Sequence, residues 1–284
     1  MKKILAAVLT AATVLTLSGC RRQQTHENGM VNYDFSKMNV DYIQLKPPTE
    51  GDKIAIIDTD YGEIRVVLYE QYAPNAVHNF IKNAEEGVYD NMPIKGVKND
   101  VYFLTGGWED KKGNYIGREE GTEPITDEYS VDLWPFTGAL MGYSENPGFN
   151  DARWFIVNND AESLTKEAID ELKEGVVQNR EDNEERAKII AMFDKFYEVG
   201  GVFGLAGENT VYGQTYLGLD IVKKLTHIAA DENFLATEEV MIKSVKISEF
   251  KAGDKTDTYP REPLHPAESG DDTESAAESS EVSE

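Results

Sequence analysis

Cysteine is almost absent from this chain of 284 residues, in which Cys20 is the only one. A single thiol excludes a disulfide within the chain. Histidine is also scarce, and its four residues are scattered without the spacing of zinc ligands: His26, His78, His227 and His265. No glycine-rich loop continues into Lys and Ser or Thr, so the sequence contains no phosphate loop. We therefore expect neither a metal nor another cofactor.

Basic residues are few, with 28 Lys and Arg against 52 Asp and Glu and a net charge of -24. Nucleic-acid binding needs a basic face that releases counterions, so we expect no nucleic-acid partner. The same charge argues against electrostatic attachment to an anionic membrane surface. A hydrophobic content of 40% is sufficient for a substantial folded core.

The N-terminal residues have the pattern of an export signal. Two lysines precede the apolar run 4–17, which suits a signal-peptide core but is short for a membrane span. The run ends in the sequence LSGC at Cys20, which resembles the lipobox of bacterial lipoproteins. We predict a signal peptide over 1–19, lipidation of Cys20, and a lipid-anchored, extracytoplasmic protein of the cell envelope. The alternative is a chance cysteine beside a signal peptide.

Composition divides the remaining chain into three parts. Residues 20–48 lack sustained periodicity and are predicted to be a lipidated tether. Residues 251–284 are rich in Ser, Ala, Glu and Asp, which predicts a disordered acidic tail. This tail either only solubilises the protein or binds basic partners. The domain lies between them, over 49–250.

Within 49–250, short β-rich runs predominate. Two of them, 54–59 and 62–70, are separated by Asp60 and Tyr61, which predicts a hairpin. A helix is predicted from Pro74 to about Gly87. Further strands are expected at 101–104, 138–142, 153–157, 210–213 and 240–250. Many short strands with few helices favour a mainly β fold, closed into an antiparallel barrel.

The order of several motifs resembles that of the cyclophilins. The opening segment contains an Ala-Pro turn, a Val-x-x-Phe helix and a Gly-x-Tyr-Asp end, and the later pieces ALMGY, RWFIV, GENTVYG and LGLDIVKKL follow in family order. The resemblance covers about 49–250, apart from an insert. It implies a closed, eight-stranded antiparallel barrel with two capping helices.

The resemblance also implies an activity, the cis-trans isomerisation of prolyl peptide bonds. Rotation about such a bond faces a barrier of ~20 kcal/mol because the amide loses its resonance. Catalysis therefore requires an apolar pocket for the proline ring and donors that favour the twisted amide. We expect a monomer that acts on proline-containing segments of exported proteins. The alternative is a non-catalytic module that binds such segments.

This chain departs from the family pattern at the main donor. The segment 91–100, where the family has a catalytic arginine, contains none, and Gly96 or Val97 takes that position. Arg153 stands where the family has a glutamine and becomes the candidate catalytic donor. The candidate substrate-binding residues carried over from the resemblance are Tyr102, Phe103, Met141, Gly142, Tyr143, Phe155, Leu205 and Asn209.

Two roles are open for Arg153. It either donates to the substrate amide, or packs its aliphatic portion along the apolar surface of the site and pairs with an acid such as Asp151 or Glu145. Lys95 and Lys98 are weaker donor candidates, because an ammonium lacks the planar fork of a guanidinium.

The insert, 159–201, is rich in helix formers with apolar stripes and predicts two helices. These form either a hairpin packed on the barrel or an arm that binds a partner.

Overall fold

The computed structural model describes residues 33–109, 115–116, 125–143, 148–159, 164–178, 180–257 and 263–265. Within them, the predicted hairpin is present as β1 (Lys53–Thr59) paired antiparallel with β2 (Gly62–Leu68). Ile57 and Ile64, which pair across β1 and β2, are buried in the interior core, whereas Ile54 and Val67 pair and are buried on the other face.

A nine-stranded antiparallel sheet forms the main body, in the order β3-β13-β1-β2-β12-β9-β11-β5-β4. The other strands are β3 (Met92–Pro93), β4 (Gly96–Lys98), β5 (Tyr102–Thr105), β9 (Ala139–Gly142), β11 (Trp154–Val157), β12 (Val211–Leu217) and β13 (Met241–Glu249). Two small sheets pair β6 (Trp108–Glu109) with β7 (Tyr115–Ile116) and β8 (Ile125–Thr126) with β10 (Phe149–Asn150).

The predicted closed eight-stranded barrel is wrong: the sheet is a curled half-barrel of nine strands. Its two edge strands, β3 and β4, are separated by only Ile94 and Lys95, yet no pairing joins them among the described residues. Ile94 N instead donates to Val240 O, 2.9 Å away, on one side, and Lys95 N donates to Leu104 O, 3.0 Å away, on the other. β3 is two residues long and ends at Pro93, which has no N–H to extend the ladder.

Two helices pack on the interior core of the sheet, at the positions predicted for the capping helices. α2 (Pro74–Glu85) and α5 (Leu219–Leu225) bury Phe80 and Leu225 in the same cluster as Trp154. Pro74 stands in the first turn of α2. The carboxylate of Glu128 accepts a hydrogen bond from Ala76 N at 3.0 Å and so satisfies a free donor at the start of this helix.

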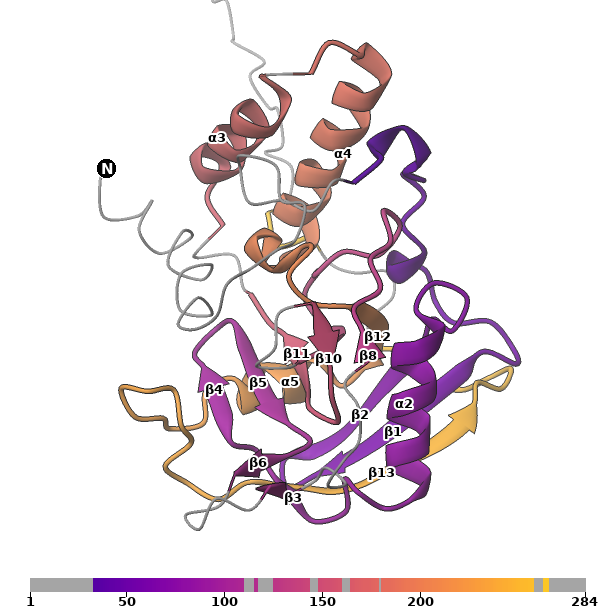
Figure 1. Cartoon of the computed structure of the whole chain (residues 1–284), viewed down its shortest axis with the longest axis vertical. Helices are drawn as coiled ribbons and strands as arrows, with labels where there is room; N and C mark the ends of the chain where they lie inside the picture. Colours follow the sequence, from indigo (N-terminus) through magenta and orange to yellow (C-terminus); the bar gives the residue numbers. More distant parts are fainter. Residues whose placement is uncertain are drawn as a thin grey trace, which may run out of the picture.

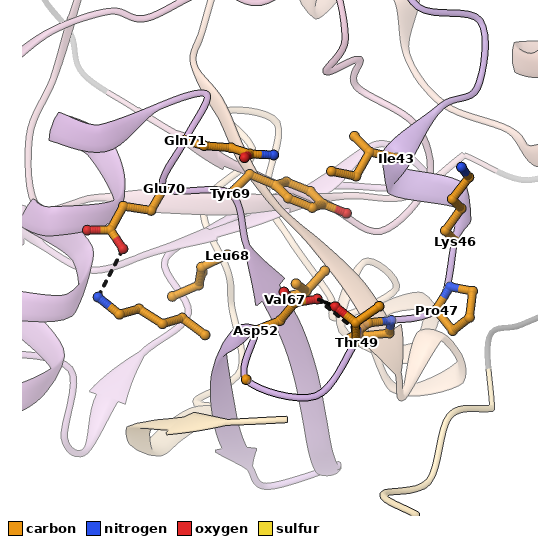
Figure 2. Close-up of a pocket in the computed structure, with 13 residues that line it drawn as sticks. Ile43, Lys46, Pro47, Thr49, Asp52, Val67, Leu68, Tyr69, Glu70 and Gln71 are labelled. Atoms are coloured by element: carbon orange, nitrogen blue, oxygen red, sulfur yellow. Dashed lines mark hydrogen bonds and ion pairs between the residues drawn. The ribbon is translucent and has the colours of Figure 1, made fainter. Parts of the chain in front are cut away.

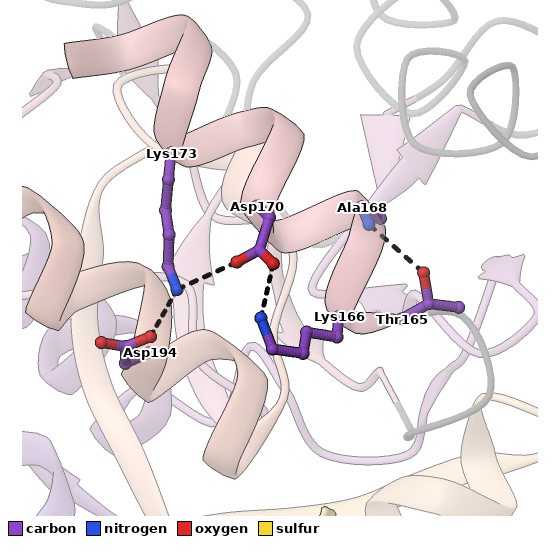
Figure 3. Close-up of polar contacts among 6 residues, drawn as sticks. All are labelled: Thr165, Lys166, Ala168, Asp170, Lys173 and Asp194. Atoms are coloured by element: carbon purple, nitrogen blue, oxygen red, sulfur yellow. Dashed lines mark hydrogen bonds and ion pairs between the residues drawn. The ribbon is translucent and has the colours of Figure 1, made fainter.

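The insert forms the two predicted helices, α3 (Lys166–Val177) and α4 (Asn183–Val199), which lie beyond one end of the strands in Figure 1. Thr165 caps α3 by accepting from Ala168 N. Figure 3 shows how Lys173 joins the two helices: its ammonium lies 3.3 Å from Asp170 and 2.5 Å from Asp194.

Residues 33–48, predicted to be a tether, pack on the domain instead. The segment contains two short 3₁₀ turns, η1 (Phe35–Lys37) and η2 (Ile43–Leu45). Phe35 is fully buried in a second core with Trp134 and Phe196 of α4. Gln44 is also fully buried and donates to Trp134 O at 2.8 Å. The packed part of the chain therefore includes residues that precede position 49.

The start of the predicted acidic tail also makes contacts. Asp257 accepts a hydrogen bond from Gly218 N at 3.1 Å, and Leu264 N donates to Glu198 O at 2.8 Å. The His265 ring stacks on Tyr197 with centroids 3.9 Å apart. The predicted signal peptide, Cys20 and the rest of the tail lie outside the described residues. Within the described part of the chain, no helix has the length and apolarity needed to span a membrane.

Candidate functional site

The candidate site lies on the outer face of β5, β9 and β11. The register places Phe155 directly opposite Met141 on one side and Leu104 on the other. Opposed residues of neighbouring strands point to the same face, whereas their chain neighbours point to the other. Trp154 and Ile156 accordingly belong to the interior core and Phe155 to a separate outer cluster.

Aromatic side chains gather around Phe155. The Tyr102 ring lies 5.3 Å from the Phe155 ring and the Tyr143 ring 6.5 Å from it, centroid to centroid. Met141 and Leu205, the latter from the turn η3 (Phe203–Leu205), belong to the same cluster. The structure thus brings together five of the predicted substrate-binding residues.

The accessible part of this face is its rim. Phe155 is only 2% exposed, because its neighbours cover it, whereas Tyr102, Leu104 and Tyr143 are partly exposed. Burial, with a smaller contribution from Tyr143, raises the pKa of Tyr102 to about 12. The Tyr102 phenol is therefore neutral at physiological pH and offers both an apolar ring and a hydroxyl.

Phe103 is not part of this face, which corrects its assignment. It is fully buried in the interior core, with its ring 6.0 Å from that of Trp154. Alternation along β5 decides the matter, since Tyr102 and Leu104 share the outer face and Phe103 takes the inner one. Leu104 was missed by the sequence analysis, although the same alternation would have indicated it once Tyr102 was chosen.

Arg153 directly precedes β11 and forms a buried ion pair with Asp151. Arg153 Nη2 lies 2.6 Å from Asp151 Oδ2, and Nε lies 3.1 Å from each carboxylate oxygen. The two side chains are 8% and 3% exposed. The guanidinium also lies over the Tyr143 ring, 4.8 Å from its centroid. Of the two roles left open by the sequence, the pairing with Asp151 is the one present here, and the donor role stays a prediction.

The position of the family arginine carries no cation in this chain. Val97 is 1% exposed and lies in the interior core, whereas Gly96 pairs with Leu104 on the outer face. A Cβ atom at Gly96 would lie 2.9 Å from Leu104 Cβ, so a larger side chain would displace Leu104.

Gly142 is not part of the outer face, which corrects its assignment, because it lies opposite Trp154 in the register and Trp154 belongs to the interior core. A Cβ atom at Gly142 would lie 2.0 Å from Asn150 Oδ1, which explains why only glycine fits there. Asn209 is 7% exposed and precedes Thr210, whose hydroxyl donates to Asp127 Oδ1 at 3.0 Å. Burial raises the pKa of Asp127 to about 6, despite the opposing effect of the Thr210 hydrogen bond.

The described residues also line a separate cavity of about 700 Å³, shown in Figure 2. It lies between the segment 43–53 and the end of β2, and none of the predicted site residues lines it. Lys53 pairs with Glu70 at its edge, 2.9 Å apart, and both side chains are about half exposed. An exposed, charged rim of this kind does not suit a proline ring, so we do not place the site there. No group of three or more His, Cys, Asp or Glu in the described part of the chain could hold a metal ion.

Comparison with known proteins agrees with this geometry. The sequence model of the family "Cyclophilin type peptidyl-prolyl cis-trans isomerase/CLD" matches residues 54–247. A Staphylococcus saprophyticus protein named "Putative peptidyl-prolyl cis-trans isomerase" is 26% identical over 209 residues, 73% of this chain and 98% of that protein. A Staphylococcus aureus protein of the same name is 24% identical over the same length.

A solved structure shares the fold. The Cryptosporidium parvum cyclophilin type peptidyl-prolyl cis-trans isomerase superposes with a TM-score of 0.50 at 20% identity, covering 70% of this chain and 99% of that one. A curled antiparallel sheet with two capping helices and an apolar outer face is therefore the architecture of a cyclophilin-like protein. The chain belongs to the cyclophilin type peptidyl-prolyl cis-trans isomerase family.

Proposed function

We propose that this protein binds prolyl segments of polypeptides on the outer face of β5, β9 and β11 and isomerises their prolyl bonds. The observation that carries the proposal is the aromatic and aliphatic face itself, in a chain of this family: Tyr102 and Leu104 remain partly exposed beside the Phe155 cluster. Such a face can bind the proline ring and thereby restrict the flanking amide. Any binding that favours the twisted amide over its planar forms lowers the ~20 kcal/mol barrier.

A second candidate function is a non-catalytic module that holds prolyl segments without isomerising them. Two observations favour it: the position of the family arginine is occupied by Gly96 or Val97, and the Arg153 guanidinium is engaged by Asp151. A donor that binds the twisted amide better than the planar forms raises the rate tenfold for every ~1.4 kcal/mol of this preference. The rate falls by the same factor where that donor is missing.

Exchange NMR on a short Ala-Pro peptide distinguishes the two functions. Catalytic amounts of the protein should accelerate cis-trans exchange if it is an isomerase, whereas a module would bind the peptide without changing the exchange rate. Absence of both binding and acceleration would contradict both functions.

Arg153→Met in the same assay tests the donor role. Loss of acceleration with unchanged peptide binding, in variant molecules that circular dichroism shows to be folded, would support a donor role for Arg153. Retained acceleration would leave it with a structural role only.

We also propose that the protein is exported and anchored through an acylated Cys20, and that it assists the folding of exported proteins. Supporting this are the apolar run 4–17 and the LSGC sequence that ends it. Labelling with a radioactive fatty acid in a bacterial host should mark the full chain and should fail for Cys20→Ser. Equal labelling of the two chains would contradict the anchor.

A further inference from the structure

Lys98 extends the candidate site toward the edge of the sheet. It pairs in register with Tyr102 of β5, and Tyr102 pairs with Val157 of β11, so these three residues share the outer face. The Lys98 ammonium lies 5.7 Å from the centre of the Phe234 ring. Lys98 is therefore the register neighbour of Tyr102 and has its ammonium near an aromatic ring.

The Lys98 ammonium has no ionic partner among the described residues, unlike Lys53, which pairs with Glu70. This is unexpected in a chain with 52 acidic residues. Two carboxylates in the adjoining segments, one two residues after Lys98 and one three residues before Phe234, make other contacts. Asp100 lies 2.9 Å from His227, and Asp231 accepts from the backbone of Leu235 at 3.0 Å.

A partly buried cation without a counter-ion is unfavourable, and burial accordingly lowers the pKa of Lys98. The fold nevertheless holds this cation beside apolar surface. Leu235, which bridges to Gly96 at the same edge, is 55% exposed, and Leu104 is partly exposed. The surface thus combines an apolar patch with one uncompensated positive charge, which is complementary to a segment with apolar residues and one carboxylate.

We propose that Lys98 selects prolyl segments that carry an acidic side chain, its ammonium binding the carboxylate while the proline lies against the Tyr102 and Phe155 face. The inference rests on the proposed function. Neighbouring strands lie about 4.8 Å apart and an extended chain advances about 3.3 Å per residue, which places Lys98 about 12 Å from Phe155. The acidic residue should therefore lie about three or four residues from the proline.

The test compares matched peptides in the exchange assay, with titration of binding alongside it. Each pair has one Ala-Pro bond and either Glu or Gln three residues away, before or after the proline. We expect the wild-type protein to favour the Glu peptide of one pair by about fivefold to tenfold in kcat/KM, through KM and not kcat, because the ion pair forms equally in the ground and transition states. If the protein only binds peptides, the same preference should appear in Kd.

Three variants assign the preference to Lys98. Lys98→Gln should lose it and Lys98→Arg should retain it. Lys246→Gln, an exposed lysine of β13 that changes the net charge equally, should behave as wild type. Equal constants for Glu and Gln peptides in the wild-type protein, or an undiminished preference in folded Lys98→Gln, would overturn the inference while the proposed function stood. If no peptide were bound or isomerised, the proposed function itself would fail.

Discussion

Two cations lie at opposite ends of the same sheet face, and their environments differ. Arg153, beside β11, is buried and forms an ion pair with Asp151, whereas Lys98, on β4, is partly exposed and has no ionic partner among the described residues. Two cations of one face thus have different electrostatic environments. We infer that the role of each depends on whether a carboxylate of the fold already compensates its charge.

The largest effect that separates the two cations should come from Arg153→Met. Removing one partner of a buried ion pair leaves the other charge uncompensated, so we expect the free energy of unfolding to fall by about 3 to 5 kcal/mol. Urea denaturation followed by circular dichroism measures this.

The matched control is Arg65→Met, because Arg65 pairs with Glu63 two residues away at 2.8 Å but at a more exposed site. That variant should lose less than about 1 kcal/mol. Equal losses would show that burial does not distinguish the pairs.

Asp127 extends the comparison to a buried acid that has no cationic partner within the described part of the chain. Its hydrogen bonds come from the Thr210 and Tyr129 hydroxyls, and burial raises its pKa from 3.8 to about 6. At pH values between these two pKa values, Asp127 holds its proton in the folded chain but not in the unfolded chain. The free energy of unfolding therefore falls as pH rises from 3.8 to about 6.

Asp127→Asn lacks this titration. As pH rises from 4.5 to 7.5, its free energy of unfolding should therefore increase relative to that of the wild type by roughly 2 kcal/mol. Urea denaturation of both chains at the two pH values gives the difference. A constant difference between the chains would show that Asp127 does not titrate in this range.

Tyr102→Ala tests the apolar wall between the two cations. Loss of the ring against Phe155 should weaken binding of an Ala-Pro peptide about tenfold, equivalent to ~1.4 kcal/mol. Isothermal titration calorimetry measures the change.

Phe103→Ala, on the inner face of the same strand, should instead destabilise the fold by about 3 to 5 kcal/mol. Weaker binding by Phe103→Ala than by Tyr102→Ala, in folded protein, would contradict the assignment of the two faces.

The smallest expected effect is the pH dependence of the Glu preference. Because burial lowers the pKa of Lys98, the ammonium should lose its proton at a lower pH than an exposed lysine does. The preference of the wild-type protein for Glu over Gln should therefore decline as pH rises, and that of Lys98→Arg should persist. Parallel declines in the two proteins would point to a titrating group other than Lys98.

Much of the fold could be predicted from the sequence, because its signals are local. Two apolar, β-branched runs on either side of Asp60 and Tyr61 indicated β1 and β2, and Pro74 marked the start of α2. The opening of the sheet was not predictable in this way, since it depends on the two-residue strand that ends at Pro93. The packing of 33–48 was missed because Phe35 is buried against α4 and Trp134, which lie far away in the sequence.

The site was predicted in part for a similar reason. The order of motifs indicated Phe155, Met141 and Tyr102, which the fold brings together on one face, but a motif does not say which of Tyr102 and Phe103 faces outward. The pairing of Arg153 with Asp151 was one of two open alternatives. The sequence does not show that both side chains are buried together, because their burial depends on the folded chain.

The central claim is that a prolyl segment binds on the outer face of β5, β9 and β11. Chemical-shift mapping of the isotope-labelled protein with an Ala-Pro peptide tests it most directly. We predict the largest shifts at Tyr102, Leu104 and Tyr143, extending to Lys98 and Leu235. Shifts confined to the cavity between 43–53 and the end of β2, with this face unchanged, would contradict the claim.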